Sequence, residues 1–106
     1  MVARAEFDAI RTLVFGGISG AYATVGTPTT HLTRIFKISN NTEGDMYFTT
    51  DNTRDEMFLS AGSFTLYDVQ ANAHRDDRYV LPIGTQFYVK QITAPVSGAV
   101  YIEILY

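Results

Sequence analysis

The sequence contains no cysteine and no tryptophan, and it has only three prolines and two histidines in 106 residues. Without cysteine, neither a disulfide framework nor a thiolate metal site can form. Stability must therefore come from side-chain packing or from neighbouring proteins. The same absence suits assembly in a reducing cytoplasm, which is the compartment that we expect for this chain.

Basic residues and long apolar runs are also scarce. Eight Lys and Arg residues are scattered along the chain against eleven Asp and Glu, and the formal net charge is -3. Because nucleic-acid binders carry a basic patch, we expect no nucleic-acid partner. Charges at positions 4, 6, 8 and 11 interrupt the N-terminal segment. We therefore expect a soluble chain with no signal peptide and no membrane partner.

Apolar residues that alternate with polar ones are abundant. Apolar types make up 46% of the sequence, which is enough for one small core. Alternation with period two predicts strands at 34–39, 45–50, 63–69, 85–93 and 98–106, and 9–15 is a weaker candidate. No window has an apolar stripe at helical spacing. The prediction is an all-β fold, a small antiparallel β-sandwich of jelly-roll-like type, with a small barrel as the alternative.

The amino-terminal third differs from the rest in its small side chains. Residues 15–30 read FGGISGAYATVGTPTT, and they offer little to bury. We divide the chain into an extended N-terminal segment, 1–30, and a sandwich domain, 31–106. Our hypothesis is that 15–30 is an arm that leaves its own core and lies on a neighbouring subunit, with Gly16, Gly17 and Gly20 at the contact. An irregular strand within the same domain is the alternative.

Turn residues separate the expected strands. The stretch SNNTEG, residues 39–44, combines Asn and Gly between two alternating segments, which predicts a hairpin. It also contains Asn40-Asn41-Thr42, a formal glycosylation triplet that we expect to be unused. At the other end, 98–106 runs apolar to its last residue, so we expect that strand to be paired inside a sheet.

A search for catalytic or metal-binding residues finds only isolated candidates. GISG, residues 17–20, matches part of a nucleophile elbow, but Ala21 stands where the motif needs glycine. His31 and His74 are 43 positions apart, too far in sequence for a local zinc motif. Nothing apolar near RDDR, residues 75–78, would raise a carboxylate pKa. We therefore predict no enzyme, no catalytic residue and no cofactor.

The acidic run DNTRDE, residues 51–56, could hold a cation through Asp51, Asp55 and Glu56. It lacks the glycine of a calcium loop, and Arg54 offers local neutralisation. We therefore predict a solvated turn and no metal site, and a structural cation remains the alternative.

Aromatic residues exceed what one small core needs, because there are seven Tyr and seven Phe. Several are expected on outward strand faces, where aromatic rings favour protein interfaces. A homo-oligomer is therefore expected. The predicted interface residues are Tyr47, Phe58, Tyr67, Tyr88 and Tyr101.

Three segments carry a family resemblance: GTPTTHLTRIFKISNNTEGDMYFTTDN, EMFLSAGSFTLYDV and LPIGTQFYVKQITAPVSGAVYIEILY. In their order they resemble small structural proteins of tailed bacteriophage virions. That pattern includes an NNT-G-D hairpin, a GSF-LYD strand and a terminal GTQFYVK…SGAVYIE hairpin. The resemblance spans about residues 10–106, and its motifs concern folding, not chemistry.

The resemblance implies a β-sandwich subunit present in many copies of the virion, assembled in the host cytoplasm. Its partners would be copies of itself and other virion proteins, either portal, neck and tail proteins or capsid proteins. We expect a head-to-tail (neck or collar) or tail position, and a capsid decoration protein is the alternative. From a different class, a carbohydrate-binding or receptor-binding module could use the loop ANAHRDDRY, residues 71–79.

Overall fold

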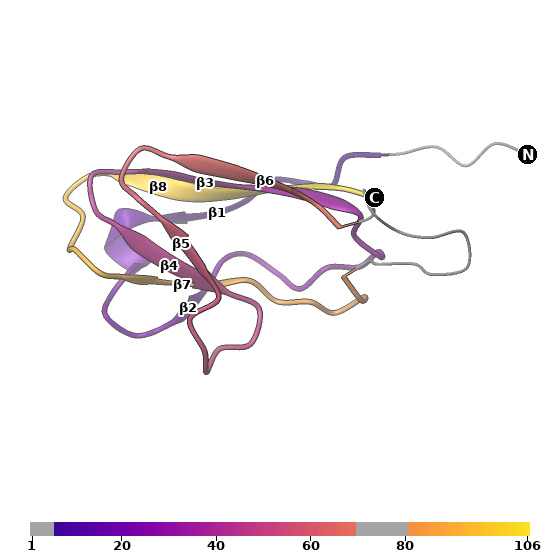
Figure 1. Ribbon diagram of the computed structural model, residues 1–106, viewed down its shortest axis with the longest axis horizontal. Helices are drawn as coiled ribbons and strands as arrows, with labels where there is room; N and C mark the ends of the chain where they lie inside the picture. The colour runs from indigo at the N-terminus through magenta and orange to yellow at the C-terminus, as the bar shows by residue number, and fades with distance from the viewer. Residues whose placement is uncertain (1–5, 70–80) are drawn as a thin grey trace, which may run out of the picture.

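The alternating segments form strands that pair into two sheets. The computed structural model describes residues 6–69 and 81–106, and within them eight strands form two antiparallel sheets of four (Figure 1). One sheet has the order β1-β8-β3-β6 and the other the order β2-β7-β4-β5. The predicted all-β sandwich is confirmed. The elements are β1 (Arg11–Val14), a 3-10 turn η1 (Phe15–Gly17), β2 (Ala23–Thr24), β3 (Ile35–Thr42), β4 (Met46–Thr49), β5 (Met57–Leu59), β6 (Phe64–Asp68), β7 (Tyr88–Gln91) and β8 (Gly98–Leu105).

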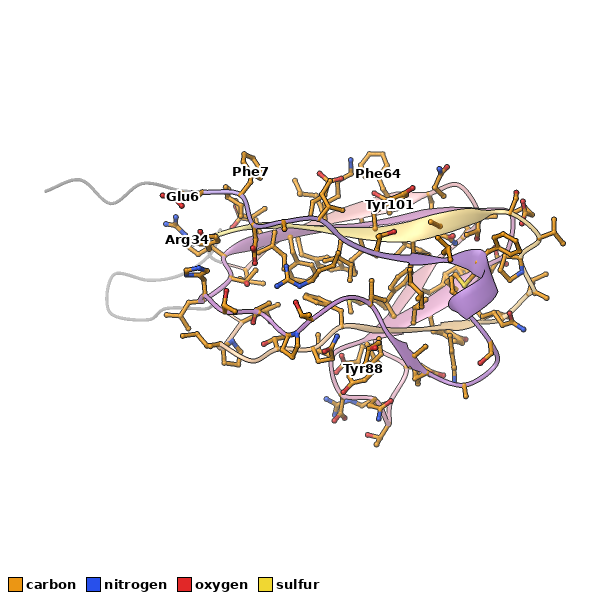
Figure 2. The ribbon with its side chains drawn as sticks, turned by 180° about the vertical axis from the view of Figure 1, so that it is seen from behind. Glu6, Phe7, Arg34, Phe64, Tyr88 and Tyr101 are labelled. Carbon is orange, nitrogen blue, oxygen red and sulfur yellow. The ribbon has the colours of Figure 1, made fainter. Side chains whose placement is uncertain are left out.

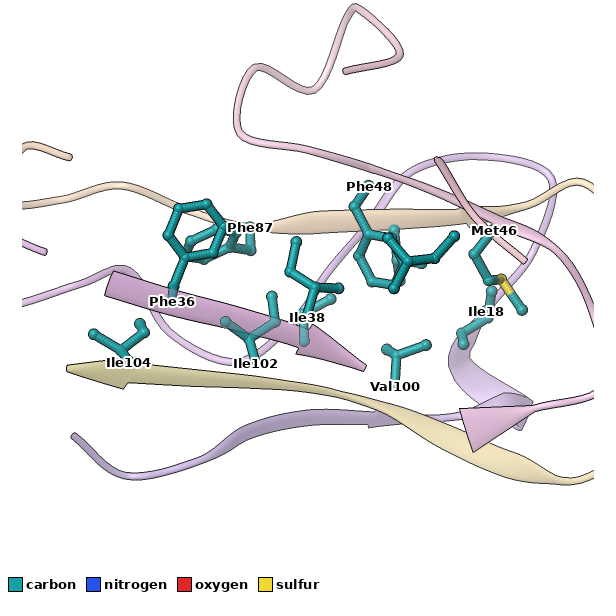
Figure 3. Close-up of a cluster of buried hydrophobic side chains, with 12 residues drawn as sticks. Ile18, Phe36, Ile38, Met46, Phe48, Phe87, Val100, Ile102 and Ile104 are labelled. Atoms are coloured by element: carbon teal, nitrogen blue, oxygen red, sulfur yellow. The ribbon is translucent and has the colours of Figure 1, made fainter. Parts of the chain in front are cut away.

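The core lies between the two sheets, where their inward side chains meet (Figure 3). β3 and β8 supply a central row from one sheet, and β4 and β7 supply the facing row from the other. Burying each large apolar side chain stabilises the fold by roughly 1.5–3 kcal/mol. The largest buried apolar side chains of these rows and their flanks are Phe36, Ile38, Ile102, Ile104, Met46, Phe48, Phe87 and Val89.

The amino-terminal segment contributes to this core, so the hypothesis of an arm that leaves its own core is wrong. Ile18 and Val25 belong to the buried cluster, and Val25 is fully buried. β2 pairs antiparallel with β7, and the Val25 N–H donates to the Phe87 carbonyl at 2.8 Å. Two apolar side chains among the small residues are enough to anchor the segment, because the small neighbours let its backbone approach β7 closely.

Residues 39–44 form a corner between the two sheets, not the predicted hairpin. β3 pairs with β8 and β6, whereas β4 pairs with β7 and β5 in the other sheet. Asn40 is 1% exposed, and its side-chain amide donates to the carbonyls of Gly44, Leu59 and Ser60. The amide therefore closes the corner through Gly44 and also ties β3 to the end of β5. Its burial also argues against glycosylation of the Asn40 triplet.

The expected hairpin between 85–93 and 98–106 is wrong for the same reason, because β7 and β8 belong to different sheets. Gly98 begins β8 with a φ of 87°, and a Cβ there would lie 2.0 Å from the Asn41 carbonyl oxygen. Backbone contact this close requires glycine. The turn residues at this corner thus serve a crossing between sheets.

The carboxyl-terminal strand is paired on both sides, as predicted. β8 lies between β1 and β3, and the Tyr106 N–H donates to the Glu6 carbonyl just beyond it. The weaker strand candidate at 9–15 is confirmed as β1, which pairs with β8. β8 therefore joins β1 to β3 within the first sheet (Figure 1).

Candidate interface on the outer sheet faces

The register of the β1-β8-β3-β6 sheet determines which side chains share its outward side, because residues directly opposite each other point the same way. Lys37 lies opposite Leu66 on one side and Glu103 on the other. We call this outward side the first face. Its members are Thr12, Val14, Ile35, Lys37, Ser39, Asn41, Phe64, Leu66, Asp68, Ala99, Tyr101, Glu103 and Leu105.

Large apolar side chains of the first face are open to solvent. Phe64 is 64% exposed and Leu66 is 61% exposed, although both lie on a strand. Phe7, which bridges to Leu105 beside β8, is 79% exposed. Figure 2 shows Phe7, Phe64 and Tyr101 on one side of the molecule and Tyr88 on the other. Exposure of several large apolar side chains on one face is typical of an interaction surface.

A shallow hollow of about 240 Å³ lies in the first face. Phe7, Ile35, Leu66 and Leu105 form its apolar walls, and Lys37 and Glu103 stand at its edge. The Lys37 amine lies 4.6 Å from the centre of the Phe64 ring. Within the part of the chain that the structure describes, no ion pair joins Lys37 to Glu103. The hollow therefore has one cation and one anion beside its apolar walls, and a second carboxylate, Asp68, lies on the first face opposite Ile35.

The outward side of the β2-β7-β4-β5 sheet, here the second face, is arranged differently. Its members are Thr24, Tyr47, Thr49, Phe58, Tyr88 and Lys90. The Tyr47 and Phe58 rings meet edge to face at 6.1 Å. The Lys90 amine lies 4.8 Å from the centre of the Tyr22 ring and 3.0 Å from an Asp55 carboxylate oxygen. Rings and charges of the second face thus contact one another within the chain.

Electrostatics of the second face confirm that its polar groups have partners. The Tyr22 hydroxyl donates to Asp55 at 2.5 Å. This hydrogen bond, followed by that from Lys90, lowers the pKa of Asp55. Burial, with Asp55 next in importance, raises the pKa of Tyr22. Tyr22, Asp55 and Lys90 therefore form one hydrogen-bonded group that has little capacity left for an outside ligand.

The acidic run at 51–56 is a self-paired turn. Arg54 pairs with Asp51 at 3.5 Å and with Glu56 at 3.0 Å, as the sequence predicted. Glu56 also accepts hydrogen bonds from Thr49 and Thr50, and the bond from the Thr50 N–H is the main cause that lowers the Glu56 pKa to about 2. Among the described residues, no group of three or more acidic or histidine side chains is placed to hold a metal ion.

The structure brings three of the five predicted interface aromatics together on the second face: Tyr47, Phe58 and Tyr88. Tyr101 is on the first face, opposite Ser39. Tyr67 was wrongly placed outward, because it points into the core and stacks on Phe36 at 4.9 Å. Whether the four outward aromatics contact other proteins stays a prediction.

The predicted glycine contacts lie apart from both faces. Gly16 and Gly20 have open space where a Cβ would be, and Gly17 lies against the Leu13 side chain. Gly16 and Gly17 belong to η1. Their place at an interface also stays a prediction.

The isolated chemical candidates are not brought together. Among the described residues, the Ser19 hydroxyl bonds only to the Ala21 backbone, and the His31 ring stacks on Tyr106 at 3.8 Å. His31 lies outside the strands. His74 and the stretches 71–79 and 75–78 lie outside the described residues.

Sequence reasoning missed the apolar members of the first face, Phe7, Phe64 and Leu66. In β6 the pattern FTLYD carries a large side chain on both sides, so alternation alone did not say which side is inward. The alternation RIFKIS did place Lys37 and Ser39 outward, and this signal could have located the first face once β6 was paired with β3.

No helix in the described part of the chain is long and apolar enough to cross a membrane. Comparison with protein-family models, curated proteins and solved structures finds no match to this chain.

Proposed function

We propose that this protein is a non-enzymatic structural subunit of a tailed bacteriophage virion. In this role it is an oligomeric β-sandwich of the head-to-tail (neck or collar) or tail region that binds neighbouring virion proteins. The observation that carries the proposal is the first face, where Phe7, Phe64 and Leu66 are each more than 60% exposed. Such a surface is costly for a free monomer and useful for an assembly subunit.

Two further observations support this proposal. The segments that resemble virion proteins build strands and sheet corners, with Asn40 and Gly98 in roles that serve the fold. Such roles fit a scaffold whose task is assembly. The chemical candidates Ser19 and His31 are engaged separately, Ser19 with backbone and His31 with a ring, which fits a protein without catalytic function.

The second face favours one alternative, a carbohydrate-binding or receptor-binding module. Phe58 is 54% exposed beside Tyr47, and sugar rings stack on exposed aromatic rings of this kind. Against it, the neighbouring Lys90 and Asp55 already pair with each other. A panel of oligosaccharides should leave the thermal midpoint of the protein unchanged, whereas a rise with sugar concentration would favour the alternative.

The direct test is to locate the chain in a particle. A phage that encodes this chain with a short epitope tag should carry antibody label at the neck or tail of purified virions. Label distributed over the capsid would favour a decoration protein, and virions without the chain would contradict the proposal. Phage carrying Phe64→Ser should assemble poorly, and phage carrying Phe58→Ser, a similarly exposed Phe on the other face, is the matched control.

A further inference from the structure

We infer that one partner of the first face is a second copy of this chain. The two copies pack their β1-β8-β3-β6 sheets face to face about a two-fold axis that runs along the boundary between β3 and β8. This inference rests on the proposed function and names one contact within the assembly. Its basis is the register of β3 and β8, which makes the first face complementary to itself.

Across this boundary the register pairs side chains of opposite charge with each other and apolar side chains with each other. Lys37 lies opposite Glu103, and Ile35 lies opposite Leu105. A two-fold axis along the boundary exchanges the positions of β3 and β8 between copies. Each β3 residue then faces the β8 residue that is its own cross-strand neighbour, but in the other copy. Lys37 of one copy meets Glu103 of the other, and the reverse contact forms as well, as an isologous interface requires.

The apolar rows match in the same way. Ile35 of one copy meets Leu105 of the other over the hollow of about 240 Å³, which these side chains line together with Phe7 and Leu66. One row further along, Ser39 lies opposite Tyr101, so the hydroxyl of each tyrosine reaches a polar partner across the axis. Because the axis runs along the strands, the strands of the two copies are aligned where their β3-β8 boundaries meet, and each row faces its matching row.

The size of the first face agrees with a reversible dimer. The four strands β1, β8, β3 and β6 have 4, 8, 8 and 5 residues, and at about 3.3 Å per residue and about 4.8 Å between strands they cover on the order of 400 Å² in each copy. The pair then buries about 800 Å², which is the size of a weak, transient interface. A dissociation constant in the micromolar range is the expected strength for so small an interface.

Charge complementarity selects a second copy as the occupant. Lys37 and Glu103 stand beside the hollow without pairing with each other in the described part of the chain. A partner that buries this area must present an anion opposite Lys37 and a cation opposite Glu103, because an unpaired buried charge is costly. The two-fold mate presents both at the required spacing.

The test measures self-association by sedimentation equilibrium from about 1 to 500 μM, a range that brackets micromolar affinity. Lys37→Glu and Glu103→Lys should each raise the dissociation constant at least tenfold, because like charges then meet across the axis. An equimolar mixture of these two variants should associate again, since each cross-axis pair is once more of opposite sign. Restoration by mixing cannot come from a contact within one chain.

Two substitutions complete the design. Leu66→Ser should also weaken the dimer, and Phe58→Ser should leave it unchanged because Phe58 is on the second face. A chain that is monomeric throughout the range would overturn the inference. A dimer whose dissociation constant is the same for the parent and for all the first-face variants would also overturn it. That result is expected if the copies pair through the β6 edge or through the second face. If either of these results is obtained and the tagged chain is still found in virions, only the dimer is contradicted and the proposed function is retained. If the tagged chain is absent from virions, the proposed function itself is contradicted.

Discussion

The outer faces of the two sheets carry large side chains, but those side chains have different contacts. On the second face, Lys90 lies between the Tyr22 and Tyr47 rings and pairs with Asp55. On the first face, the only ring contact of Phe64 among the described residues is with the Lys37 amine, and Leu66 is open to solvent. The charged groups at the second face are paired within the chain, whereas Lys37 and Glu103 of the first face form no ion pair among the described residues.

This difference teaches that aromatic content alone does not locate an interface. The second face has more of the aromatic residues predicted for an interface, yet its rings and charges stabilise the monomer. The first face has fewer rings and more exposed aliphatic surface, which gains more from being covered. Three predictions test this division of roles.

The largest expected effect is a difference in the free energy of unfolding between substitutions on the two sides of β8. Ile104 is 1% exposed in the core, so Ile104→Ala should lower the free energy of unfolding by about 2–5 kcal/mol. Leu105 points outward on the first face, so Leu105→Ala should cost less than about 1 kcal/mol in the monomer and should weaken self-association. Urea unfolding at low protein concentration measures the first quantity, and sedimentation measures the second. Equal losses in the monomer would mean that the first face belongs to the fold.

A smaller effect should follow from dismantling the group on the second face. Tyr22→Phe removes the hydroxyl that donates to Asp55, so the thermal midpoint should fall by a few degrees while self-association is unchanged. Tyr88→Phe is the matched control on the same face, because the Tyr88 hydroxyl has no hydrogen-bond partner among residues 6–69 and 81–106. If Tyr22→Phe changes the oligomeric state and leaves the midpoint intact, the roles of the faces are reversed.

The smallest expected effect is the loss of thermal stability at low pH that comes from the Glu56 carboxylate. The pKa of Glu56 is lowered to about 2 in the folded chain, chiefly by the Thr50 N–H, against about 4.3 when unfolded. A carboxylate with a lowered folded pKa stabilises the fold above its unfolded pKa, and this stabilisation is lost as pH falls toward the folded pKa. The parent and Glu56→Gln should therefore differ in thermal midpoint at pH 6 and converge between about pH 4 and pH 2. Parallel profiles would show that the turn does not depend on this charge.

Inward residues of β8 and of the first half of β3 could be predicted from the sequence, because the inward face of each is apolar there. Ile102 and Ile104 in β8 are examples, and both are buried. The side of β6 that faces the core could not be predicted in this way, because Phe64 and Tyr67 are both large and lie on opposite sides of the strand. Pairing with β3 resolves the competition by placing Tyr67 beside Phe36.

The corners and the first face escaped prediction because both depend on pairing over long sequence distances. Asn40 and Gly44 have turn chemistry that fits a hairpin and a corner equally well, and the partners of β3 decide between them. Likewise, Lys37 and Glu103 become neighbours only through the register of β3 with β8. Local patterns carry no information on a pair separated by more than sixty residues.

The central position of β8 has a consequence for how the protein is made. β1 has no strand partner in the described residues other than β8, and Arg11 lies opposite Ile102. Because β8 joins β1 to β3, the first sheet cannot close until residues near 105 have left the ribosome. Pairing such distant segments costs a large loop-closure entropy before any favourable contact forms. Sheets of this kind therefore fold in milliseconds to seconds. Until β8 is in place, the edges and apolar side chains of β1 and β3 are exposed. We therefore expect this chain to be most prone to aggregation during synthesis and early folding.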